Sequence, residues 1–429
     1  MVAKINLISP LSTNQYNYLS RVPNSWLNVA EGGKRGGKNI LNALAFAMTL
    51  EEHPNRLHLI GAVSIANAKM NIIDCDGFGL LNYFEGRCRE GKYKNKDCLY
   101  IKTKTSEKIV LIAGGLKDGD EKYIKGNSYG TAYVTEANEC HVKFVKEVFD
   151  RTIASKDRKI FHDFNPKAEA HYYYVDILDF HEKRQKNNPN YGLNYGHFTI
   201  ADNMSLTQEK INREMATYDK KSIWFQRDIL GLRKQVEGLV YDMFDDGNLY
   251  DDTERPENLE HRTQRTIALD YGTTNPTVFL DIYDDDEFIW VDNEYRFDYN
   301  EAEGKKKKSD VQYADDMVIF MGKEYQCEII ADPSAESFIT ELKNRLFFVT
   351  GADNDVLNGI RRLSTLFYKK IIKIHKYRCA GLVKELQAYV WDEKAAKYGE
   401  EKPVKQGDHG ADALRYFVNT KIPKWRIGV

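Results

Sequence analysis

The sequence has little that would mark a secreted, membrane-bound or zinc-ribbon protein. Among 429 residues there are 10 prolines and 6 cysteines, and no two cysteines form a C-x-x-C pair, so neither a zinc ribbon nor a dithiol redox site is indicated. No apolar run reaches the roughly 18 residues that a membrane-spanning helix needs, and Pro10 interrupts the N-terminal segment before a signal-peptide core can form. The composition therefore predicts a protein of the reducing cytosol without a membrane segment.

An excess of one charge is also missing. The chain has 62 Lys and Arg against 64 Asp and Glu, a formal net charge of -2, so any contact with nucleic acid must come from local patches. Hydrophobic residues make up 42% of the chain and charged residues 29%, which is typical of a folded protein and excludes extensive disorder. A chain of this length is too long for one ordinary core, and we expect two or three domains.

The first part of the chain repeats a short apolar run, a polar or glycine-rich turn and a helical pattern. This order predicts an α/β domain with a mainly parallel sheet over residues 1–244. The predicted strands, each apolar enough to be buried on both faces, are Trp26–Ala30, Arg56–Ala62, Lys108–Ala113, Thr131–Val134 and Lys159–Asp163. Helices are expected over Asn39–Glu52, Ala66–Phe84 and Thr207–Tyr218.

Residues 245–262 are acidic, contain a proline and lack periodicity, which is typical of a linker. We expect a second domain over residues 263–429. It opens with an antiparallel meander whose strands are Thr266–Asp270, Thr277–Tyr283 and Glu287–Tyr295. A further strand and four helices follow, at Cys327–Ala331, Ala335–Leu346, Ile360–Phe367, Ala380–Trp391 and Gly410–Thr420. This order, with acids near strand ends, outlines a ribonuclease-H-like fold.

The strongest local signal is a glycine-rich turn between a predicted strand and a predicted helix. It matches G-x-x-x-x-G-K, with asparagine where serine or threonine is expected, and consists of Gly32, Gly33, Lys34, Arg35, Gly36, Gly37, Lys38 and Asn39. Glycines let backbone N–H groups surround a polyphosphate, and Lys38 would reach the terminal phosphates. A surface turn is the alternative, but the strand–turn–helix context favours a nucleotide site. Lys34 and Arg35 either help to neutralise the γ-phosphate or are solvated.

Nucleotide hydrolysis also needs an acidic group near the phosphates. The predicted strand Thr131–Val134 continues through Thr135 to Glu136, a carboxylate that would orient or deprotonate the attacking water. A glutamate that merely ends the strand is the alternative, and the phosphate loop makes it the less favoured one. We therefore predict that Glu136 is catalytic.

Three aspartates in the second domain are candidate metal ligands. Asp270 ends the first strand of the meander, Asp332 ends the strand Cys327–Ala331, and Asp412 lies one turn into the last helix. Phosphodiester cleavage needs an activated water and a stabilised leaving oxygen, which two divalent ions roughly 3.5–4 Å apart provide. We predict that these aspartates are catalytic and hold two Mg²⁺ or Mn²⁺ ions.

Two residues before Asp412 could share its helix face. Asp408 and His409 precede it by four and three positions. Asp408 is either a further metal ligand or the N-cap of the helix, and His409 is favoured as a polar partner behind the ligands. Further upstream, the run Lys305–Lys308 is either a solvated loop or a contact for DNA phosphates.

In their joint order these motifs resemble the large terminase subunit of tailed bacteriophages, and the likeness covers nearly the whole chain. Further stretches that carry it are Lys125-Gly126, Glu136–Glu139, Asn165-Pro166, Asp202-Asn203, Phe225–Gly231, Glu237–Tyr241, Asp270–Gly272, Asp332-Pro333 and Asp408–Tyr416. The resemblance implies a P-loop NTPase domain that uses ATP with Mg²⁺ to move double-stranded DNA into the procapsid. It implies a nuclease domain that cleaves concatemeric DNA.

The resemblance has further implications for partners and coupling. It implies a small terminase subunit, a portal protein, a homo-oligomeric ring on the procapsid and a location in the host cell cytoplasm. Asn165 resembles the position that couples hydrolysis to movement, although an Asn-Pro turn explains it equally well.

Two residues depart from the family pattern. Asn39 stands where a hydroxyl residue is usual, and Thr135 stands where an aspartate usually precedes the catalytic glutamate. An amide carbonyl and a hydroxyl can still hold Mg²⁺ directly or through water, but we expect weaker metal affinity. The alternative function is therefore a metal-dependent DNA nuclease or resolvase with a degenerate, non-hydrolysing nucleotide-binding domain. A structural adaptor with both sites decayed is disfavoured, because Lys38, Glu136 and the three aspartates are all present.

Overall fold

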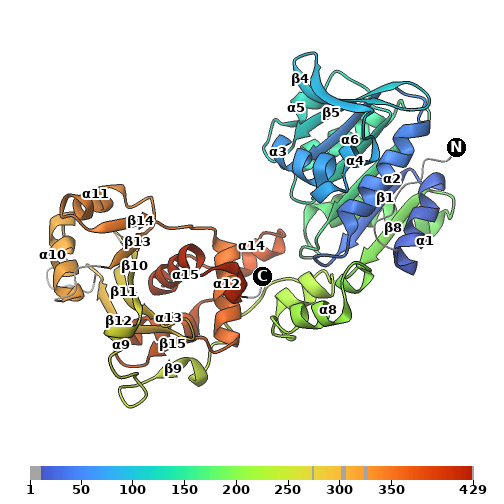
Figure 1. Ribbon diagram of the computed structural model, residues 1–429. Helices are drawn as coiled ribbons and strands as arrows, with labels where there is room; N and C mark the ends of the chain where they lie inside the picture. Colours follow the sequence, from blue (N-terminus) through green and yellow to red (C-terminus); the bar gives the residue numbers. More distant parts are fainter. Residues whose placement is uncertain (1–10, 273–274, 301–305, 323–326, 428–429) are drawn as a thin grey trace. The chain divides into compact units, whose positions relative to one another are not determined.

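The computed structural model describes residues 11–272, 275–300, 306–322 and 327–427. The chain divides into an N-terminal unit, residues 1–215 with 220–235, and a C-terminal unit, residues 216–219 with 236–429 (Figure 1). Each unit is built on its own sheet. Within the described ranges, no helix is both long and apolar enough to cross a membrane.

The N-terminal unit contains an eight-stranded sheet with the order β3-β4-β5-β2-β6-β7-β1-β8. From β5 to β8 all neighbouring strands are parallel, and β3 and β4 form an antiparallel hairpin at one edge. The bounds are β1 Leu27–Gly32, β2 Leu57–Ala62, β3 Cys88–Tyr93, β4 Lys96–Lys102, β5 Glu107–Gly114, β6 Thr131–Thr135, β7 Lys159–Phe164 and β8 Leu193–Phe198. The five strands predicted here are confirmed.

Helices cover both faces of this sheet, because successive residues of its strands point to opposite sides. On one face Ile60 and Phe161 pack with Phe46 of α2, and on the other Leu59 and Ile160 pack with other helices. The helices are α1 Thr13–Arg21, α2 Lys38–Glu52, α3 Ile65–Ala68, α4 Leu80–Tyr83, α5 Glu121–Ile124, α6 Val142–Thr152, α7 Asp179–Asn187 and α8 Gln208–Met215.

The helix predicted over Ala66–Phe84 is wrong in its middle. The chain forms α3, a π-helical turn over Lys69–Asp74, a short 3-10 turn over Cys75–Gly77 and then α4. Cys75 and Asp76 have φ values of 47° and 52°, in the left-handed region, and this reversal breaks the helix. The spacing of apolar residues is helical on both sides of Cys75 and Asp76, so this spacing alone does not reveal the break.

The C-terminal unit contains a seven-stranded sheet with the order β14-β13-β10-β11-β12-β15-β9. The predicted meander is confirmed: β10, β11 and β12 are antiparallel neighbours. Parallel strands extend it on both sides. The bounds are β9 Leu249–Tyr250, β10 Gln264–Asp270, β11 Thr277–Asp284, β12 Ile289–Phe297, β13 Glu328–Ala331, β14 Phe348–Gly351 and β15 Ile372–His375.

Helices also lie on both sides of this second sheet (Figure 1). Tyr313 of α10 and Phe338 of α11 pack on Phe279 of β11, whereas α15 packs against β10 and β11 together with α12 and α13. The helices are α9 Leu259–Arg262, α10 Asp310–Met321, α11 Glu336–Asn344, α12 Val356–Tyr368, α13 Ala380–Ala388, α14 Glu393–Lys397, α15 His409–Lys421 and α16 Lys424–Ile427.

Residues 245–262 are not a separate linker. They contribute β9, which pairs with β15, and two of their acids form ion pairs with later residues of the same unit: Asp251 pairs with Lys376 at 2.6 Å and Asp245 with Lys370 at 2.7 Å. These contacts make the segment part of the C-terminal unit. The two units divide after Gln235, earlier than the predicted end at residue 244.

A buried ion pair ties the last part of the N-terminal unit to its sheet. Glu31, at the end of β1, is fully buried, and its carboxylate accepts hydrogen bonds from Tyr174 at 2.7 Å, Tyr195 at 2.8 Å and Arg233 at 2.7 Å. A buried carboxylate without a cationic partner is costly. The segment that contains Arg233 is therefore held beside the glycine-rich loop that follows Glu31.

Replacing Arg233 with methionine should destabilise the N-terminal unit by about 3 kcal/mol, because it leaves the Glu31 carboxylate buried without a cation. Urea unfolding measures this loss. The double variant Arg233→Met with Glu31→Gln should recover most of it, since the amide carries no charge. A single variant as stable as the wild type would contradict this account of the ion pair.

Candidate active sites

The glycine-rich loop Gly32–Asn39 connects β1 to α2, as the sequence predicts. A Cβ atom on Gly32 would lie 1.8 Å from the carbonyl oxygen of Phe198, and one on Gly33 would lie 2.5 Å from that of Asp228. Gly37 has a φ of 78° at the N-cap of α2. Glycine is therefore required where the loop backbone passes close to its neighbours. The loop ends at the N-terminus of a 15-residue helix, whose first backbone N–H groups can bind an anion.

Lys38 extends back across this loop. It is 6% exposed, and its ammonium group donates to the carbonyl oxygen of Gly33 at 2.6 Å and to the side-chain oxygen of Asn165 at 3.0 Å. Burial lowers the pKa of Lys38 to about 8, although nearby carboxylates, Asp163 first among them, act in the opposite direction. The predicted coupling residue Asn165 thus contacts the loop lysine directly.

Lys34 and Arg35, which share the loop, differ in what they contact. The Lys34 ammonium lies 3.3 Å from the Asp228 carboxylate, and its backbone N–H donates to the Asp228 carbonyl at 2.6 Å. Arg35 is exposed, and its backbone carbonyl accepts a hydrogen bond from Asn203 at 2.8 Å. Lys34 is therefore engaged by the turn Phe225–Ile229, whereas the Arg35 side chain is solvated.

The two departures from the usual nucleotide-site pattern contact each other. The Asn39 amide donates to the Thr135 hydroxyl at 3.1 Å, and that hydroxyl donates to the Asp163 carboxylate at 3.0 Å. Thr135 and Asp163 are paired in the register of the parallel strands β6 and β7. Asp163 was not among the predicted site residues. The only signal for it was an acid at the end of a predicted strand.

Glu136 follows β6 at the same edge of the sheet. Its φ of 50° is left-handed, so the chain turns sharply off the strand there. Its side chain is half-buried, and burial first, then the Asp163 and Glu139 carboxylates, raise the pKa of Glu136 above its ordinary value. A carboxylate with a raised pKa is a stronger base near neutral pH, as activation of water requires.

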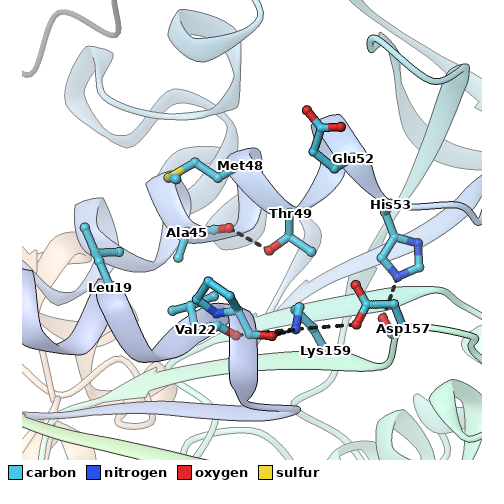
Figure 2. Close-up of a pocket in the computed structure, with 10 residues that line it drawn as sticks. Leu19, Val22, Ala45, Met48, Thr49, Glu52, His53, Asp157 and Lys159 are labelled. Atoms are coloured by element: carbon cyan, nitrogen blue, oxygen red, sulfur yellow. Dashed lines mark hydrogen bonds and ion pairs between the residues drawn. The ribbon is translucent and has the colours of Figure 1, made fainter. Parts of the chain in front are cut away.

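A cavity of about 280 Å³ in this unit is remote from the loop. Met48, Thr49 and His53, at or just beyond the carboxyl end of α2, line it, and α2 rises about 21 Å between its two ends at 1.5 Å per residue. Figure 2 shows the Lys159 ammonium directed between Val22 and Asp157, at 3.4 Å from each oxygen. The cavity is thus separate from the phosphate loop.

Strand register places the first two predicted metal ligands side by side. Leu269 of β10 pairs with Ala331 of β13 in a parallel ladder, so Asp270 and Asp332 leave adjacent strands at the same edge. Adjacent strands lie about 4.8 Å apart. The sequence predicted both strand ends, and the sheet order now makes them neighbours.

Asp412 reaches the same region from α15. The N-terminus of α15 is fixed by Glu385 of α13, whose carboxylate accepts hydrogen bonds from the backbone N–H groups of Gly410 at 2.6 Å and Ala411 at 3.2 Å. Asp408 occupies the N-cap position, but its side chain makes no capping hydrogen bond. Asp408 is therefore the N-cap residue of α15, as one alternative predicted, although its side chain does not cap the helix.

Each acid of this cluster is held by a protein group. Asp270 accepts from His409 at 2.8 Å, Asp332 from Tyr416 at 3.0 Å, and Asp412 pairs with Arg415 at 2.9 Å and Lys405 at 3.2 Å. Within the described part of the chain, no three Asp, Glu, His or Cys side chains converge closely enough to hold a metal ion. The three aspartates Asp270, Asp332 and Asp412 therefore do not converge on a common metal site as predicted, because these contacts direct the carboxylates to separate partners.

The chemistry of the cluster nevertheless suits a divalent cation. Burial raises the pKa of Asp270, and the neighbouring Asp412 and Asp408 carboxylates raise it further. Asp408 is 5% exposed, and its Oδ2 atom accepts no hydrogen bond from any described residue, although the Lys405 ammonium lies 3.6 Å away. Crowded carboxylates are hard ligands of the kind that Mg²⁺ and Mn²⁺ prefer. The donor set fits these ions, and side-chain rotations would have to bring it together.

Tyr416 belongs to this cluster, although the sequence analysis included it only in the stretch Asp408–Tyr416 and not among the site residues. It lies four residues after Asp412 on α15, and its pKa is raised by burial first and then by Asp270, Asp412 and Asp332 together. Its hydroxyl is therefore close to all three acids. The spacing of four residues along the last predicted helix was the available signal.

Comparisons of the sequence and of the structure with known proteins point to the same family. Residues 30–251 match the N-terminal family model of the T4likevirus-type terminase large subunit. The solved large terminase of a thermophilic bacteriophage is 30% identical, with a TM-score of 0.81, and the match covers 96% of this chain and 99% of that one. This chain belongs to the large terminase family. The complex of the same phage terminase with ATP-gamma-S is also 30% identical, with a TM-score of 0.78 over 96% of this chain and 100% of that one. No curated protein sequence matches the chain.

The lysine run predicted as a loop or a DNA contact lies between β12 and α10 of the C-terminal unit. Lys305 lies outside the described residues, and Lys308 is paired with Asp316 at 2.5 Å. Lys306 and Lys307 are exposed, and the Lys307 ammonium lies 4.9 Å from the centre of the Tyr299 ring. Only part of this run is therefore engaged within the terminase fold.

Replacing Asp270 with asparagine should lower the pKa of His409. Burial acts to lower this pKa, but the Asp270 carboxylate, with Asp408 and Glu385, outweighs it and raises the pKa above its ordinary value. In the wild type this pair stabilises the folded state at low pH and loses that contribution as pH rises through the folded pKa of His409. NMR titration of the His409 ring measures the shift.

Asp332→Asn is the matched control, because Tyr416 rather than His409 donates to that carboxylate. Its His409 titration should remain close to that of the wild type. An unchanged His409 titration in Asp270→Asn would show that the contact between them does not set this pKa.

Proposed function

We propose that this terminase hydrolyses ATP to move double-stranded DNA into a procapsid and cleaves concatemeric DNA with divalent metal ions. The observation that carries the proposal is that the glycine-rich loop with Lys38 and the acid Glu136 follow parallel strands of one sheet, β1 and β6, at the same edge. The solved complexes of the thermophilic phage terminase with ADP and with ATP-gamma-S support the nucleotide. The expected partners are double-stranded DNA, a small terminase subunit, a portal protein and further copies in a ring, in the host cell cytoplasm.

Different residues of the N-terminal unit bind the phosphates, hold the metal ion and activate water. Backbone N–H groups of the loop and the Lys38 ammonium bind the phosphates, and the start of α2 adds its partial positive charge. Asn39 and Thr135 would hold Mg²⁺ through an amide carbonyl and a hydroxyl, and that ion supplies charge neutralisation at the phosphates. Glu136 orients the attacking water and accepts its proton.

Asn165 provides a route from this site to the rest of the N-terminal unit. Its side chain accepts from Lys38, and its backbone carbonyl accepts from Asn138, two residues after Glu136. A change at the phosphates that moves Lys38 would therefore alter its hydrogen bond with Asn165. This contact supports its role in coupling over a simple Asn-Pro turn.

The acids of the C-terminal unit would act on DNA. Asp270, Asp332 and Asp412, with Asp408 as a further ligand, would hold two Mg²⁺ or Mn²⁺ ions, which supply an activated water and stabilise the leaving oxygen. His409 lies behind Asp270 and fixes the orientation of that carboxylate. The exposed Lys306 and Lys307 would contact DNA phosphates without sequence preference.

Replacing Glu136 with glutamine should reduce DNA-stimulated ATP hydrolysis by at least about 100-fold, because the amide cannot accept the proton of water. ATP binding should be retained. Glu52→Gln is the matched control: this exposed residue at the carboxyl end of α2 pairs with Lys104 at 2.9 Å, and its loss should leave turnover near that of the wild type. Unchanged turnover in Glu136→Gln would remove Glu136 from the mechanism.

A wild type that binds ATP but shows no turnover at any Mg²⁺ concentration would favour the non-hydrolysing nuclease.

Replacing Asp270 with asparagine should abolish Mn²⁺- or Mg²⁺-dependent nicking of plasmid DNA and leave ATP hydrolysis intact, since the two sites lie in different units. Asp285→Asn is the control in the same unit. Asp285 lies in the β11–β12 turn, where it accepts from Trp290 at 2.8 Å, and its loss should leave nicking intact. Equal nicking by Asp270→Asn and the wild type would refute the metal assignment.

A further inference from the structure

Asp163 is a buried acid for which the mechanism above has no role. It is 1% exposed, at the end of β7. The Tyr133 hydroxyl donates to one of its carboxylate oxygens at 2.5 Å and the Thr135 hydroxyl to the other at 3.0 Å. Both donors lie on the neighbouring strand β6. A carboxylate taken this far from water is costly unless its oxygens are satisfied, and here two hydroxyl groups satisfy them.

The Asp163 carboxylate fixes the direction of a chain of hydrogen bonds. An ionised carboxylate only accepts, so the single proton of the Thr135 hydroxyl must point toward Asp163. The Thr135 oxygen is then free to accept, and it accepts from the Asn39 amide nitrogen at 3.1 Å. The Asn39 amide is thereby oriented with its nitrogen toward Thr135, which leaves its carbonyl oxygen as the end that can bind a cation.

This chain of contacts begins at the two positions where a nucleotide-bound magnesium is normally held. In P-loop NTPases a loop hydroxyl and an aspartate on the neighbouring strand hold that ion, and here the two positions carry Asn39 and Thr135. Thr135 pairs in register with Asp163, so the missing carboxylate is present one strand further along the sheet, about 4.8 Å away.

Asp163 is placed to orient these groups rather than to bind the ion itself. Both of its oxygens accept hydrogen bonds from hydroxyl groups, and these bonds and the charge of Lys38 act against the rise in the pKa of Asp163 that burial causes. Groups behind the direct ligands of a metal set ligand orientation, and their loss typically lowers metal affinity by 10–100-fold.

We infer that Asp163 replaces, from the adjacent strand, the carboxylate that position 135 lacks: it holds Thr135 and Asn39 in the orientation that binds the nucleotide's magnesium. Asp163 is thus a positioning residue of the ATPase site. The inference rests on the proposed nucleotide site and adds to it the reason why that site can work without its usual metal ligands.

Mn²⁺ binding to the full chain tests this inference. Electron paramagnetic resonance titrations with and without saturating ADP give, by difference, the Mn²⁺ that requires nucleotide and exclude Mn²⁺ bound at the acids of the C-terminal unit. Asp163→Asn should weaken this affinity by at least about tenfold, because the asparagine amide can donate as well as accept and no longer fixes the Thr135 proton. Fluorescent ADP binding in EDTA should stay unchanged.

Three further variants sharpen the test. Thr135→Val removes the hydroxyl and leaves Asp163 in place, so it should weaken nucleotide-dependent Mn²⁺ binding to a similar extent. The double variant Asp163→Asn with Thr135→Asp returns a carboxylate to position 135 and should restore the affinity. Thr131→Val is the matched control, because it removes a buried hydroxyl of the same strand that donates to the Lys159 carbonyl at 2.5 Å rather than to Asp163, and it should change the affinity by less than about threefold.

The outcomes separate this inference from the proposed function. Failure of the wild type to bind ADP in EDTA would refute the nucleotide site itself. Wild-type Mn²⁺ affinity in Asp163→Asn or in Thr135→Val would overturn the role of Asp163, as would a loss of metal-free ADP binding equal to the loss of Mn²⁺ binding. Should Asp163→Asn fail to fold, as judged by circular dichroism, Thr135→Val and the double variant decide the question.

Discussion

Both candidate sites depend on one constraint, which is that parallel strands end at the same edge of a sheet. In the N-terminal unit β1, β6 and β7 are parallel, and the groups that follow or end them are the phosphate loop, Glu136 and Asp163. In the C-terminal unit the same rule brings together Asp270 and Asp332 from β10 and β13. Each of these strands buries apolar residues, which help to fix its register, and the register in turn places the polar groups at the strand ends.

Buried carboxylates are the second common element, and each has a specific set of donors. Glu31 is held by an arginine and two tyrosines, Asp163 by two hydroxyl groups, and Glu385 by Arg296 and the first N–H groups of α15. Among the acids around α15, Asp412 pairs with the buried Arg415 and with Lys405, whose side chain is 64% exposed. The contact with the exposed Lys405 is weak and easily exchanged, which suits a carboxylate that must rearrange around a metal ion.

The sequence predicted those parts of the structure that depend on local pattern. Apolar strands, the loop at Gly32–Asn39 and the acids at strand ends follow from residue spacing. The order of strands does not, and this is why Asp163 was missed: only the adjacency of β6 and β7 brings it to Thr135. The break at Cys75 and the pairing of β9 with β15 also depend on tertiary contacts, which neither helical spacing nor acidic composition reveals.

The central claim is that strand-end groups form two separate sites for divalent metal ions, one of them dependent on nucleotide. Anomalous diffraction from a crystal soaked with Mn²⁺ and ADP tests it most directly. The account predicts one manganese peak beside Asn39 and Thr135, lost when ADP is left out, and further peaks among Asp270, Asp332 and Asp412 whether or not ADP is present. Manganese bound elsewhere, with none at these aspartates or beside the loop, would contradict it.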